Sequence, residues 1–446
     1  MFGIAGLVIS GGGRASAQSG DWTVIDLGTH GGKWSRPYDI NESGELVGTS
    51  QIDLGGTRYH GWYWTLDTGL VEIPTDPTAR SKARSINNSG IIAGWSSNVG
   101  TGPRAMYIEN KVQRDLGTFG GGFSKARQIN EQNTIVGFAE NSAGQRIAFR
   151  WLYDVGILES LGTLGGDESE ARSVNNFDQV VGWFHYLPTG HEHAFIWDER
   201  FGMRDLGTLG GNGSAAYGIN DLGMVTGDSN SLSGFRHAFL WTEASGMESL
   251  GTLGGKESLG RGINNLGQIV GRATLSSGQT HGFVWQKSTG MVDVNDLTAV
   301  DEEWIIDEVR SINDVGYMVG TARKAGMELP HAVLIVPPLS IEKPIPGVAG
   351  VKNRFVARGS IPGARVLLFG STRAGQTRIP VCLQGIQLDF ARPVLIGDLR
   401  SDGRGLAEAA RKVRGSLSGV LAYFQSVEVT EFGCRKSDTL QYQFPQ

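Results

Sequence analysis

The sequence predicts an all-β protein: a seven-bladed β-propeller closed by its N-terminal strand, followed by a small C-terminal β-sandwich. The first observation is a motif that returns seven times, in which Ile or Val precedes Asn, a polar turn follows, and a short apolar segment ends in Gly. Successive copies lie 43 to 49 residues apart, a period typical of propeller blades. The repeated asparagines are Asn41, Asn87, Asn130, Asn175, Asn220, Asn264 and Asn313.

The second observation is that one repeat holds four short strand-like segments. In the fifth repeat these are Ala215–Asn220, Met224–Gly227, His237–Trp241 and Met247–Gly251, each bounded by Gly, Asn, Asp or Ser. The segments are too short for helices, and their β-branched and aromatic content favours strands. Asn-Asp-x-Gly between the first two predicts a tight hairpin turn, because Asx side chains bond the local backbone and Gly accepts a positive φ.

The third segment indicates how the sheets pack. His237, Phe239 and Trp241 point to one side of the strand, and Ala238 and Leu240 point to the other, because a strand has a period of two. Both faces are therefore mainly apolar, one bulky and one small. We expect each sheet to be covered on both sides by its neighbours, with large side chains meeting small ones.

The third observation concerns the two ends of the repeat region. The seventh repeat lacks a fourth segment, since Pro337-Pro338 follows its third, whereas Trp22–Gly28 matches the fourth segment of the other repeats. A strand from the N-terminus that completes the last blade would close a ring and remove both open edges, which favours a propeller over a solenoid of stacked sheets. The predicted propeller spans residues 21–338.

Composition limits the classes of function. The net charge is −5, and no run or stripe of Lys and Arg appears along the chain, so we expect no nucleic-acid partner. An apolar run over Phe2–Ser10 precedes Ala15-Ser16-Ala17, a small-x-small cleavage site, which predicts a signal peptide over residues 1–17 and export to the periplasm or cell surface. No other run has the length of a membrane span, so no transmembrane segment is expected in the mature chain.

The chain after the repeats reads as a linker and a separate module. Residues 339–350 are rich in Pro and Gly, and 351–446 are predicted to form a small β-sandwich. Its expected strands are Arg365–Phe369, Val381–Leu383, Val394–Ile396, Gly419–Gln425 and Leu440–Phe444, while Leu406–Val413 suits a short helix or a polar strand. The only two cysteines, Cys382 and Cys434, indicate a disulfide in an exported chain; two buried free thiols are the alternative.

Three recurring units resemble a bacterial extracellular repeat, the HAF repeat. They are His237-Ala238-Phe239, Leu206-Gly207-Thr208-Leu209-Gly210-Gly211 and Ile219-Asn220, and the similarity spans roughly 21–337, about three quarters of the chain. The resemblance implies an exported repeat protein with an added C-terminal module, and it implies no established activity. The sequence departs from the pattern at Arg104-Ala105-Met106 and Ile147-Ala148-Phe149, where His-Ala-Phe would stand.

Two repeated polar residues have a structural and a functional interpretation. Five histidines share one repeat position, and we favour an imidazole that bonds a turn of its own blade over a metal site or a pH-sensitive rim, because equivalent positions on neighbouring blades lie too far apart for one metal. These are His60, His193, His237, His281 and His331. The repeated asparagines carry carbonyl oxygens that suit calcium, but without an Asp-x-Asp ladder a turn-capping role is favoured. No metal and no cofactor is predicted.

The loop Leu-Gly-Thr-x-Gly-Gly recurs five times, and it should join the outer strand of one blade to the inner strand of the next. Such loops gather on one face, where backbone amides and hydroxyls can bond sugar hydroxyls and aromatic rings can stack on a sugar; a tight crossover that needs Gly is the simpler interpretation. The loop is absent before the second and seventh blades, which would make the face uneven. The candidate ligand-binding residues are Thr29, His30, Trp34, Thr118, Phe119, Phe123, Thr163, Thr208 and Thr252.

Motifs of catalysis are absent from the sequence, including the Gly-x-Ser-x-Gly elbow, His-Glu-x-x-His, the phosphate-binding Gly-rich loop and Cys-x-x-Cys. Asp167, Glu168 and Glu170 form the densest carboxylate cluster; they suit glycoside hydrolysis or, more simply, solvated loop charges. We therefore expect a non-enzymatic exported scaffold that presents loops to a carbohydrate, surface polymer or protein. A polysaccharide-acting enzyme and a purely structural envelope protein are the alternatives.

Overall fold

The computed structural model describes most of the chain from Trp22 onward. The described residues are 22–444 without 74, 75, 77, 98–101, 299–302, 342, 343, 346, 349, 350, 361–363, 380–385, 391, 392, 403, 405, 414–420, 431 and 432. The predicted signal peptide, residues 1–17, lies outside this part of the chain, and so do Cys382 and the side chain of Cys434 with the predicted disulfide.

The described residues form an all-β protein with one 3-10 turn, η1 (Val294–Asp296). Seven of their sheets are antiparallel and four-stranded, and we number these sheets one to seven in chain order. Sheet one contains β2 (Ser35–Ile40), β3 (Leu46–Gln51), β4 (Tyr59–Thr65) and β5 (Gly69–Glu72). Sheet two contains β6 (Arg80–Ile86), β7 (Ile92–Ser97), β8 (Arg104–Glu109) and β9 (Val112–Asp115). Sheet three contains β10 (Gly120–Ile129), β11 (Ile135–Asn141), β12 (Arg146–Leu152) and β13 (Ile157–Gly162). Sheet four contains β14 (Ser169–Val174), β15 (Val180–Tyr186), β16 (His191–Asp198) and β17 (Gly202–Asp205). Sheet five contains β18 (Gly210–Ile219), β19 (Val225–Ser231), β20 (Arg236–Thr242) and β21 (Gly246–Ser249). Sheet six contains β22 (Gly254–Ile263), β23 (Ile269–Leu275), β24 (Thr280–Gln286) and β25 (Gly290–Asp293).

The seventh sheet joins the two ends of the repeat region. It contains β26 (Trp304–Ile312), β27 (Met318–Lys324), β28 (His331–Val336) and, at its outer edge, β1 (Thr23–Asp26) from the N-terminus. β1 pairs with β28 in antiparallel register, with Thr23 opposite Val336 and Asp26 opposite Val333. The outer edge of this sheet is thus built from a segment that lies about 300 residues away in sequence.

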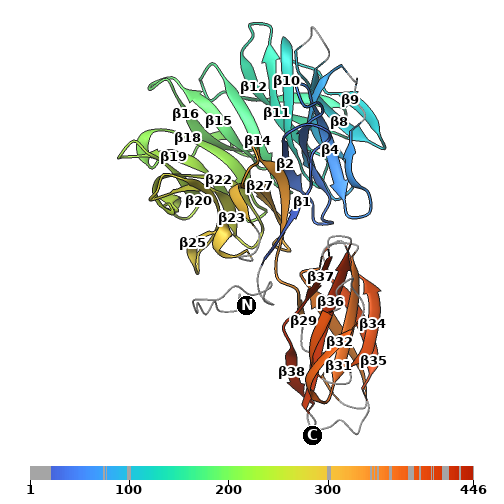
Figure 1. Ribbon diagram of the computed structural model, residues 1–446. Helices are drawn as coiled ribbons and strands as arrows, with labels where there is room; N and C mark the ends of the chain where they lie inside the picture. Colours follow the sequence, from blue (N-terminus) through green and yellow to red (C-terminus); the bar gives the residue numbers. More distant parts are fainter. Residues whose placement is uncertain are drawn as a thin grey trace.

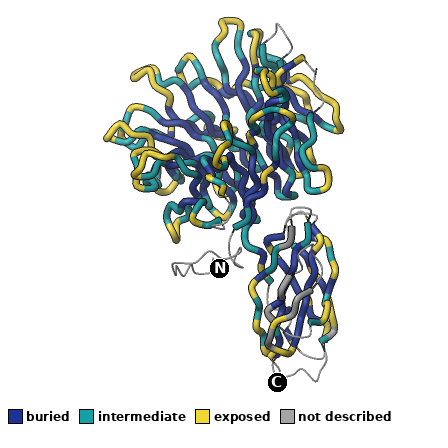
Figure 2. Tube along the Cα trace, viewed as in Figure 1, coloured by how far each residue is buried: buried dark blue, intermediate teal, exposed yellow. Residues whose placement is uncertain are grey.

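The first strands of the seven sheets stand side by side around one axis (Figure 1). Each of these inner strands packs against its successor, and β2 also packs against β26 and β27 of the seventh sheet, so the series closes on itself. Burial follows this arrangement, because the second strands are buried along most of their length and exposed residues gather at the outer loops (Figure 2). The arrangement is that of a β-propeller-like all-β fold.

The seven repeated asparagines form a closed ring of hydrogen bonds near this axis. Each Nδ2 donates to the backbone carbonyl of the asparagine in the next sheet, over 2.9–3.2 Å, and Asn313 donates back to Asn41. In the first six sheets Oδ1 accepts the backbone N–H groups two and four residues later, so the same side chain also fixes its hairpin turn. The asparagines are only 1–5% exposed, and a buried amide with this many partners is strongly position-specific.

A second ring lies one residue further along the chain. The backbone N–H of each following residue donates to the side-chain oxygen of its equivalent in the next sheet, over 2.7–3.2 Å. These residues are Glu42, Asn88, Glu131, Asn176, Asp221, Asn265 and Asp314. The ring of carboxylates and amides marks one face of the fold, which we call the Asn face; the opposite face, which carries the Leu-Gly-Thr-x-Gly-Gly loops, is the loop face.

The sheets pack as the alternation in the third segment predicts. Phe239 and Trp241 of the fifth sheet share a core with Ala194 of the fourth, while Ala238, on the other side of the same strand, packs against Phe283 of the sixth. Large side chains thus meet small ones where the fifth sheet packs against its two neighbours. Adding or removing one methylene group there would change the stability of the fold, because the packing is close.

The chain beyond 338 forms further sheets next to the Asn face (Figure 1). One sheet contains β29 (Ser340–Ile341), β30 (Lys352–Arg358) and β35 (Ala407–Lys412); another contains β31 (Arg365–Ser371), β34 (Val394–Arg400), β36 (Leu421–Thr430), β37 (Gly433–Lys436) and β38 (Leu440–Gln443); β32 (Ala374–Ile379) pairs with β33 (Ile386–Phe390). Phe355 of β30 and Phe424 of β36 meet in one core. Of the two alternatives for 406–413, the strand is the one found.

The seventh sheet and the C-terminal part share specific contacts. The hydroxyl of Tyr317, at the start of β27, donates to the backbone carbonyl of Ser360 and is buried. Ala364 belongs to the same core cluster as Tyr317, and Arg400 lies 3.6 Å from Asp67 in a turn of the first sheet. The C-terminal sheets are therefore anchored on the Asn face at the first and seventh sheets.

Asn220 offers a clean test of the ring, because its Nδ2 has the carbonyl of Asn264 as its hydrogen-bond partner and its Oδ1 serves Leu222 and Met224. Asn220→Ala should lower the free energy of unfolding by about 2–4 kcal/mol, since three backbone groups, in one buried and two partly buried hydrogen bonds, lose their partner. Urea denaturation measures this. Asn220→Asp keeps the acceptor and loses the donor, so a smaller loss is expected, and exposed Asn212→Ala should have almost no effect.

Removal of residues 21–28 tests the closure. Without β1 the outer edge of β28 is unpaired, so the truncated chain should melt at a lower temperature and associate through that edge. Thermal unfolding and size-exclusion chromatography measure the two effects. A truncated chain that stays monomeric and melts like the full chain would show that β1 does not hold the ring closed.

Candidate functional site

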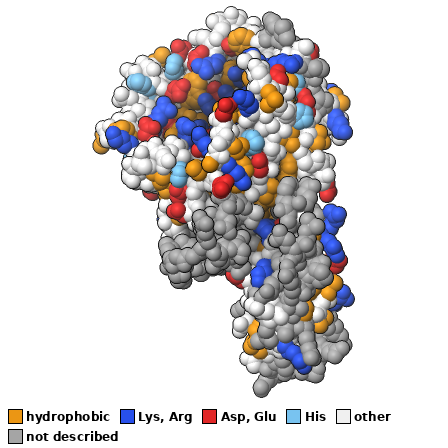
Figure 3. Space-filling view, in the orientation of Figure 1, with side chains coloured by type: hydrophobic (Ala, Val, Ile, Leu, Met, Phe, Trp, Pro, Cys, Tyr) orange, Lys and Arg blue, Asp and Glu red, His pale blue; other side chains and the backbone are white. Residues whose placement is uncertain are grey.

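A ring of basic and aromatic side chains lies on the axis, at the residue three positions before each repeated asparagine. This position holds five arginines and two tyrosines: Tyr38, Arg84, Arg127, Arg172, Tyr217, Arg261 and Arg310. The absence of a basic stripe in the sequence thus proved misleading, because these arginines stand some 45 residues apart and only ring closure brings them together. In Figure 3, Lys and Arg side chains are seen within the hollow among the sheets.

The arginine ring lines an axial cavity of about 260 Å³. One end of the cavity holds the five arginines and two tyrosines, and the other end holds the ring of carboxylates and amides on the Asn face. The two ends therefore carry opposite charge. Burial first, and then neighbouring Asp314, raise the pKa of Glu42 at the second end to about 7, although a backbone bond from Asp314 opposes this.

Two buried glutamates pair with four of the five arginines. Glu170 lies 2.8 Å from Arg127 and 2.7 Å from Arg172, and Glu308 accepts from Arg261 at 2.8 Å and from Arg310. Burial alone would raise the pKa of Glu308, but the adjacent arginines lower it to about 2. Each glutamate is thus a counter-ion shared between two arginines of the ring, and Glu170 also lies 4.0 Å from Arg146.

Arg84 is the arginine of this ring that has no carboxylate within ion-pair distance among the described residues. Its guanidinium lies 4.0 Å from the centre of the Tyr38 ring, and its Nε is buried without a hydrogen-bond partner in that part of the chain. Burial, followed by the positive charge of Arg127, lowers the pKa of Arg84 to about 9. A cation held in this way leaves its charge uncompensated, because a ring quadrupole orients a cation without neutralising it.

A second layer of side chains faces the axis above the arginines, on the loop face. Because the strand period is two, the residue five positions before each asparagine shares this orientation, and it is Lys82 in the second sheet and Lys125 in the third. Lys82 lies 5.1 Å from the ring centre of Tyr59 and 5.8 Å from that of Trp95, and Lys125 lies 5.1 Å from Trp95. Neither lysine has a carboxylate within ion-pair distance among the described residues.

These contacts continue as a chain across the first four sheets. Trp34 lies 6.0 Å from Tyr59, Arg80 lies 5.8 Å from Tyr59, and Arg146 lies 5.9 Å from Phe138 and 5.2 Å from Trp183. We call this set the basic–aromatic crescent: Trp34, Tyr59, Arg80, Lys82, Trp95, Lys125, Phe138, Arg146 and Trp183. In sheets five to seven, the position of Lys82 and Lys125 is held by Ala215, Leu259 and Glu308. The position opposite it on the second strand, where sheets two and three have Trp95 and Phe138, is held by Asp228, Arg272 and Thr321. The loop face is therefore markedly uneven.

The loop residues singled out from the sequence are spread over several sheets. The hydroxyls of Thr29, Thr118, Thr208 and Thr252 each donate to the glycine carbonyl three residues later, at 2.8–3.0 Å, so their protons serve the loop itself; Thr163 lies in the same position of its loop. Phe119 is partly buried against a core cluster, whereas Phe123 is 43% exposed. Of these residues Trp34 alone joins the crescent through a ring contact.

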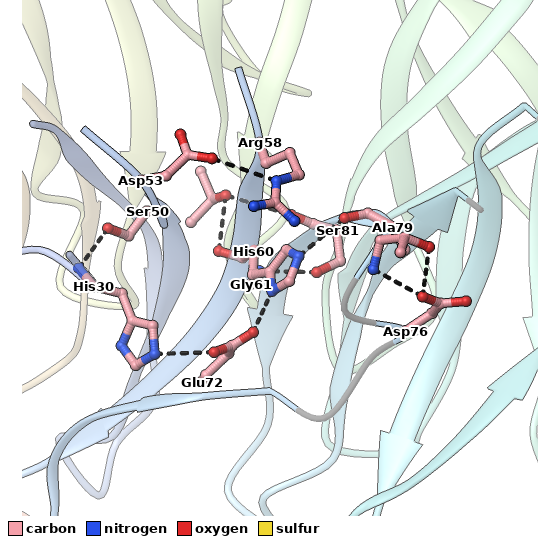
Figure 4. A network of polar contacts seen from close by, with 12 residues as sticks. His30, Ser50, Asp53, Arg58, His60, Gly61, Glu72, Asp76, Ala79 and Ser81 are labelled. Carbon is pink, nitrogen blue, oxygen red and sulfur yellow. Dashed lines mark hydrogen bonds and ion pairs between the residues drawn. The ribbon is translucent and has the colours of Figure 1, made fainter. Parts of the chain in front are cut away.

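The five repeated histidines tie the third strand of a sheet to its outermost strand. Their Nδ1 atoms contact Glu72, Asp205, Ser249, Asp293 and, across the closure, Asp26. Figure 4 shows the first of these contacts, in which Glu72 lies between His60 and His30. The Nε2 of His30 is 2.9 Å from the Glu72 carboxylate. The Nε2 of His60 contacts the backbone carbonyl of Ala79 at 2.9 Å. His30 is thus tied to the first sheet, away from the arginine ring.

The three carboxylates of the acidic cluster of the fourth sheet differ in their main partners, although Glu168 and Glu170 both lie within 4.0 Å of Arg146. Asp167 contacts His185 at 2.7 Å and is exposed, and Glu168 pairs with Arg146 at 2.8 Å. Glu170 is only 1% exposed and belongs to the arginine ring, which corrects its interpretation as a solvated loop charge. The reason is its place on an inner strand, facing the axis. The carboxylates do not converge on one point as a glycosidase pair would.

Two features are absent from the described residues. Those residues contain no group of three or more His, Cys, Asp or Glu side chains that could hold a metal ion. Within the same part of the chain, no helix has the length and apolar character of a membrane span.

Comparison with known proteins yields similarity in structure only. No family model and no curated protein matches the chain. Solved structures with similarity include TolB from Acinetobacter baumannii (TM-score 0.37, 13% identity, 51% of this chain and 53% of that chain) and the gluconolactonase XC5397 from Xanthomonas campestris (0.36, 10%, 72% and 91%). Hydrazine synthase from Kuenenia stuttgartiensis is a third (0.32, 11%, 92% and 61%). The chain spans about half the length of TolB from Acinetobacter baumannii. The fold described above follows from the sheets and the closed hydrogen-bond rings of this chain itself.

Tyr38 reports on the charge of the axial site. Burial alone would raise its pKa, but Arg84, Lys82 and Arg310 lower it to about 8. Ultraviolet titration of tyrosinate should therefore show one phenol ionising about two units below the ordinary value near 10. Since a phenol with a lowered folded-state pKa favours the folded state once ionised, stability should rise from about pH 8 to 10 through this group. Arg84→Met should move the titration upward; an unchanged curve would contradict the proximity of the two charges.

Proposed function

We propose that this protein is an exported, non-enzymatic binding scaffold whose loop face binds an acidic polysaccharide. The observation that carries the proposal is the basic–aromatic crescent. Lys82, Lys125 and Arg80 lie against aromatic rings with no carboxylate within ion-pair distance among the described residues, so a positive potential remains on that face. It remains there although the whole chain has a net charge of −5.

The aromatic members of the crescent have two different roles in this proposal. Trp95, Phe138 and Trp183 are buried and serve as platforms that hold the cations in place. Trp34 and Tyr59 are half-buried, so their exposed edges and faces are available to a sugar ring beside the lysines. A uronate or a sulfated sugar combines an apolar ring face with an anionic group, which is the chemistry that such a surface recognises.

The proposal includes the architecture. We infer that the seven four-stranded sheets are the seven blades of one propeller over 21–338, and that the sheets of 351–446 form a sandwich module fixed to the Asn face. We also infer that the repeats are HAF repeats. In support, the His-Ala-Phe histidine of the fourth and fifth sheets makes the same Nδ1 contact to the residue twelve positions later. Export rests on the signal-like segment 1–17.

Binding of the full chain to a polysaccharide panel tests this function. Uronate-bearing and sulfated polymers should bind, neutral glucans should not, and affinity should fall as salt is added, because exposed charge interactions are screened. Lys125→Met should weaken binding by roughly three- to tenfold, the range expected for one partly exposed charged contact. Microscale thermophoresis over a series of salt concentrations gives both quantities.

Lys352→Met is the matched control, because it removes the same charge from an exposed position of β30, outside the crescent. The control should bind like the unmodified chain. Equal weakening by both variants would show that only net charge matters. Single-stranded DNA belongs in the panel as well, since stacking rings and cations also bind nucleic acid; a preference for DNA over acidic sugars would overturn the proposal.

A further inference from the structure

The axial cavity has the features of a second binding site, separate from the crescent. It has a volume of about 260 Å³, room for a small ion and a few water molecules, each of which occupies about 30 Å³. Five guanidinium groups line one end of it. Guanidinium groups present several N–H donors in a planar fork, which matches the oxygens of a carboxylate, sulfate or phosphate.

The charges at the arginine end do not balance. Glu170 is shared between Arg127 and Arg172, and Glu308 between Arg261 and Arg310, so two carboxylates face four guanidinium groups and Arg84 adds a fifth. A third carboxylate, Asp39, is half-buried in the wall of the same cavity and accepts from the hydroxyls of Ser85 and Ser311. Excess buried charge of one sign is costly unless a counter-ion supplies the missing partner.

Arg84 marks the point at which the partner is missing. Its guanidinium packs on Tyr38, and the guanidinium of Arg310 lies 5.6 Å from the centre of the same ring. The Nε of Arg84 is buried and without a hydrogen-bond partner among the described residues, although Arg84 lines the cavity. Arg84 therefore combines a place in the cavity wall with a buried donor that lacks a partner, and an ion or water bound beside it is one explanation for such a group.

We propose that the arginine end of the axial cavity binds a small oxyanion, a carboxylate, sulfate or phosphate group, with Arg84 as its principal donor. The carboxylates of the Asn face stand at the other end of the cavity, so they confine an anion to the arginine end by repulsion. This site goes beyond the proposed function, because it is small, axial and lined by guanidinium groups rather than by lysines on the loop face.

The position of the site explains an otherwise unfavourable feature of the fold. In the absence of an anion, Arg84 is held close to other cations, and this repulsion destabilises the folded chain. With an anion bound, the same cations become its ligands. A purely structural arginine would show the opposite relation, because its removal would cost stability under all conditions.

Isothermal titration calorimetry and thermal unfolding of the full chain test the proposal, with acetate, succinate, sulfate and phosphate as probes at constant ionic strength and chloride as the reference. At least one oxyanion should bind with a measurable affinity and raise the melting temperature. Acetate and succinate identify a carboxylate site, and sulfate and phosphate a site for tetrahedral anions. If none of the four binds better than chloride, the proposal is wrong.

Arg84→Met should weaken binding of the preferred anion about tenfold or more, in line with loss of a charge-assisted bond. Without anion, this variant should melt at the same temperature as the unmodified chain or higher. Arg365→Met is the matched control: Arg365 is exposed in the C-terminal sheets, where it pairs with Asp398 at 2.7 Å, and its loss should leave anion binding unchanged. A variant at Arg84 that binds the anion normally would overturn the proposal.

A second readout needs no variant and covers the case in which Arg84→Met fails to fold. Tyr38 lines the same end of the cavity, so a bound anion should hinder ionisation of its phenol and shift its titration to higher pH. Saturating oxyanion should therefore raise the midpoint for this tyrosine, and chloride should not. An unchanged midpoint at saturation would place the anion elsewhere and contradict the site. Polysaccharide binding at the crescent is scored separately, so the two proposals can fail independently.

Discussion

The closed ring of asparagine hydrogen bonds is the constraint on which the rest of the structure depends. Each buried asparagine fixes its own hairpin through Oδ1 and its neighbour's position through Nδ2, so turn geometry and inter-sheet spacing are set by the same side chain. The ring has no free end, because Asn313 donates to Asn41. A buried polar network stabilises a fold only when every member has its hydrogen-bond partners. The closed ring therefore requires a fixed number of repeats.

Closure has an electrostatic consequence. It places the same register position of all seven repeats around one axis. A charged residue at that position therefore lies close to its equivalents from the other sheets, and their charges add. At the position three before the asparagine, five of seven repeats carry Arg. The carboxylates of Glu170, Glu308 and Asp39 offset part of this charge, and an excess remains around Arg84. The same rule gives the crescent, where Lys82 and Lys125 of adjacent sheets meet Trp95 between them.

The sequence was sufficient to predict the repeated four-stranded unit, because its signals are local: short β-branched segments, an Asx-Gly turn, and an alternation that pairs Phe239 with small residues of the preceding sheet. It also predicted that a segment near Trp22 completes the last sheet, since a missing element and an extra element of the same type could be matched. The strands β29, β30, β32, β33 and β37 were not predicted, and β29 lies within the predicted linker 339–350, because that part of the chain has no repeat against which a weak segment can be compared.

The axial site could not be seen in the sequence for a physical reason. Arg84, Arg127 and Arg310 are separated by dozens of residues, and a search for basic runs along the chain does not align them. Aligning the repeats on their asparagines would have revealed the arginine column three residues earlier. The loop threonines stay a prediction for the converse reason: their spacing is visible in sequence, but the partner of each hydroxyl, a carbonyl three residues away, is visible only in the structure.

A crystal structure of the full chain soaked in selenate, an electron-rich oxyanion, would test the central claim most directly. We predict seven sheets closed by the asparagine ring, with an anomalous peak on the axis within hydrogen-bonding distance of the Arg84 guanidinium. An axis without such a peak, with Arg84 paired to a carboxylate, would contradict the account of the uncompensated charge; an open or differently counted ring of sheets would contradict the constraint from which that charge arises.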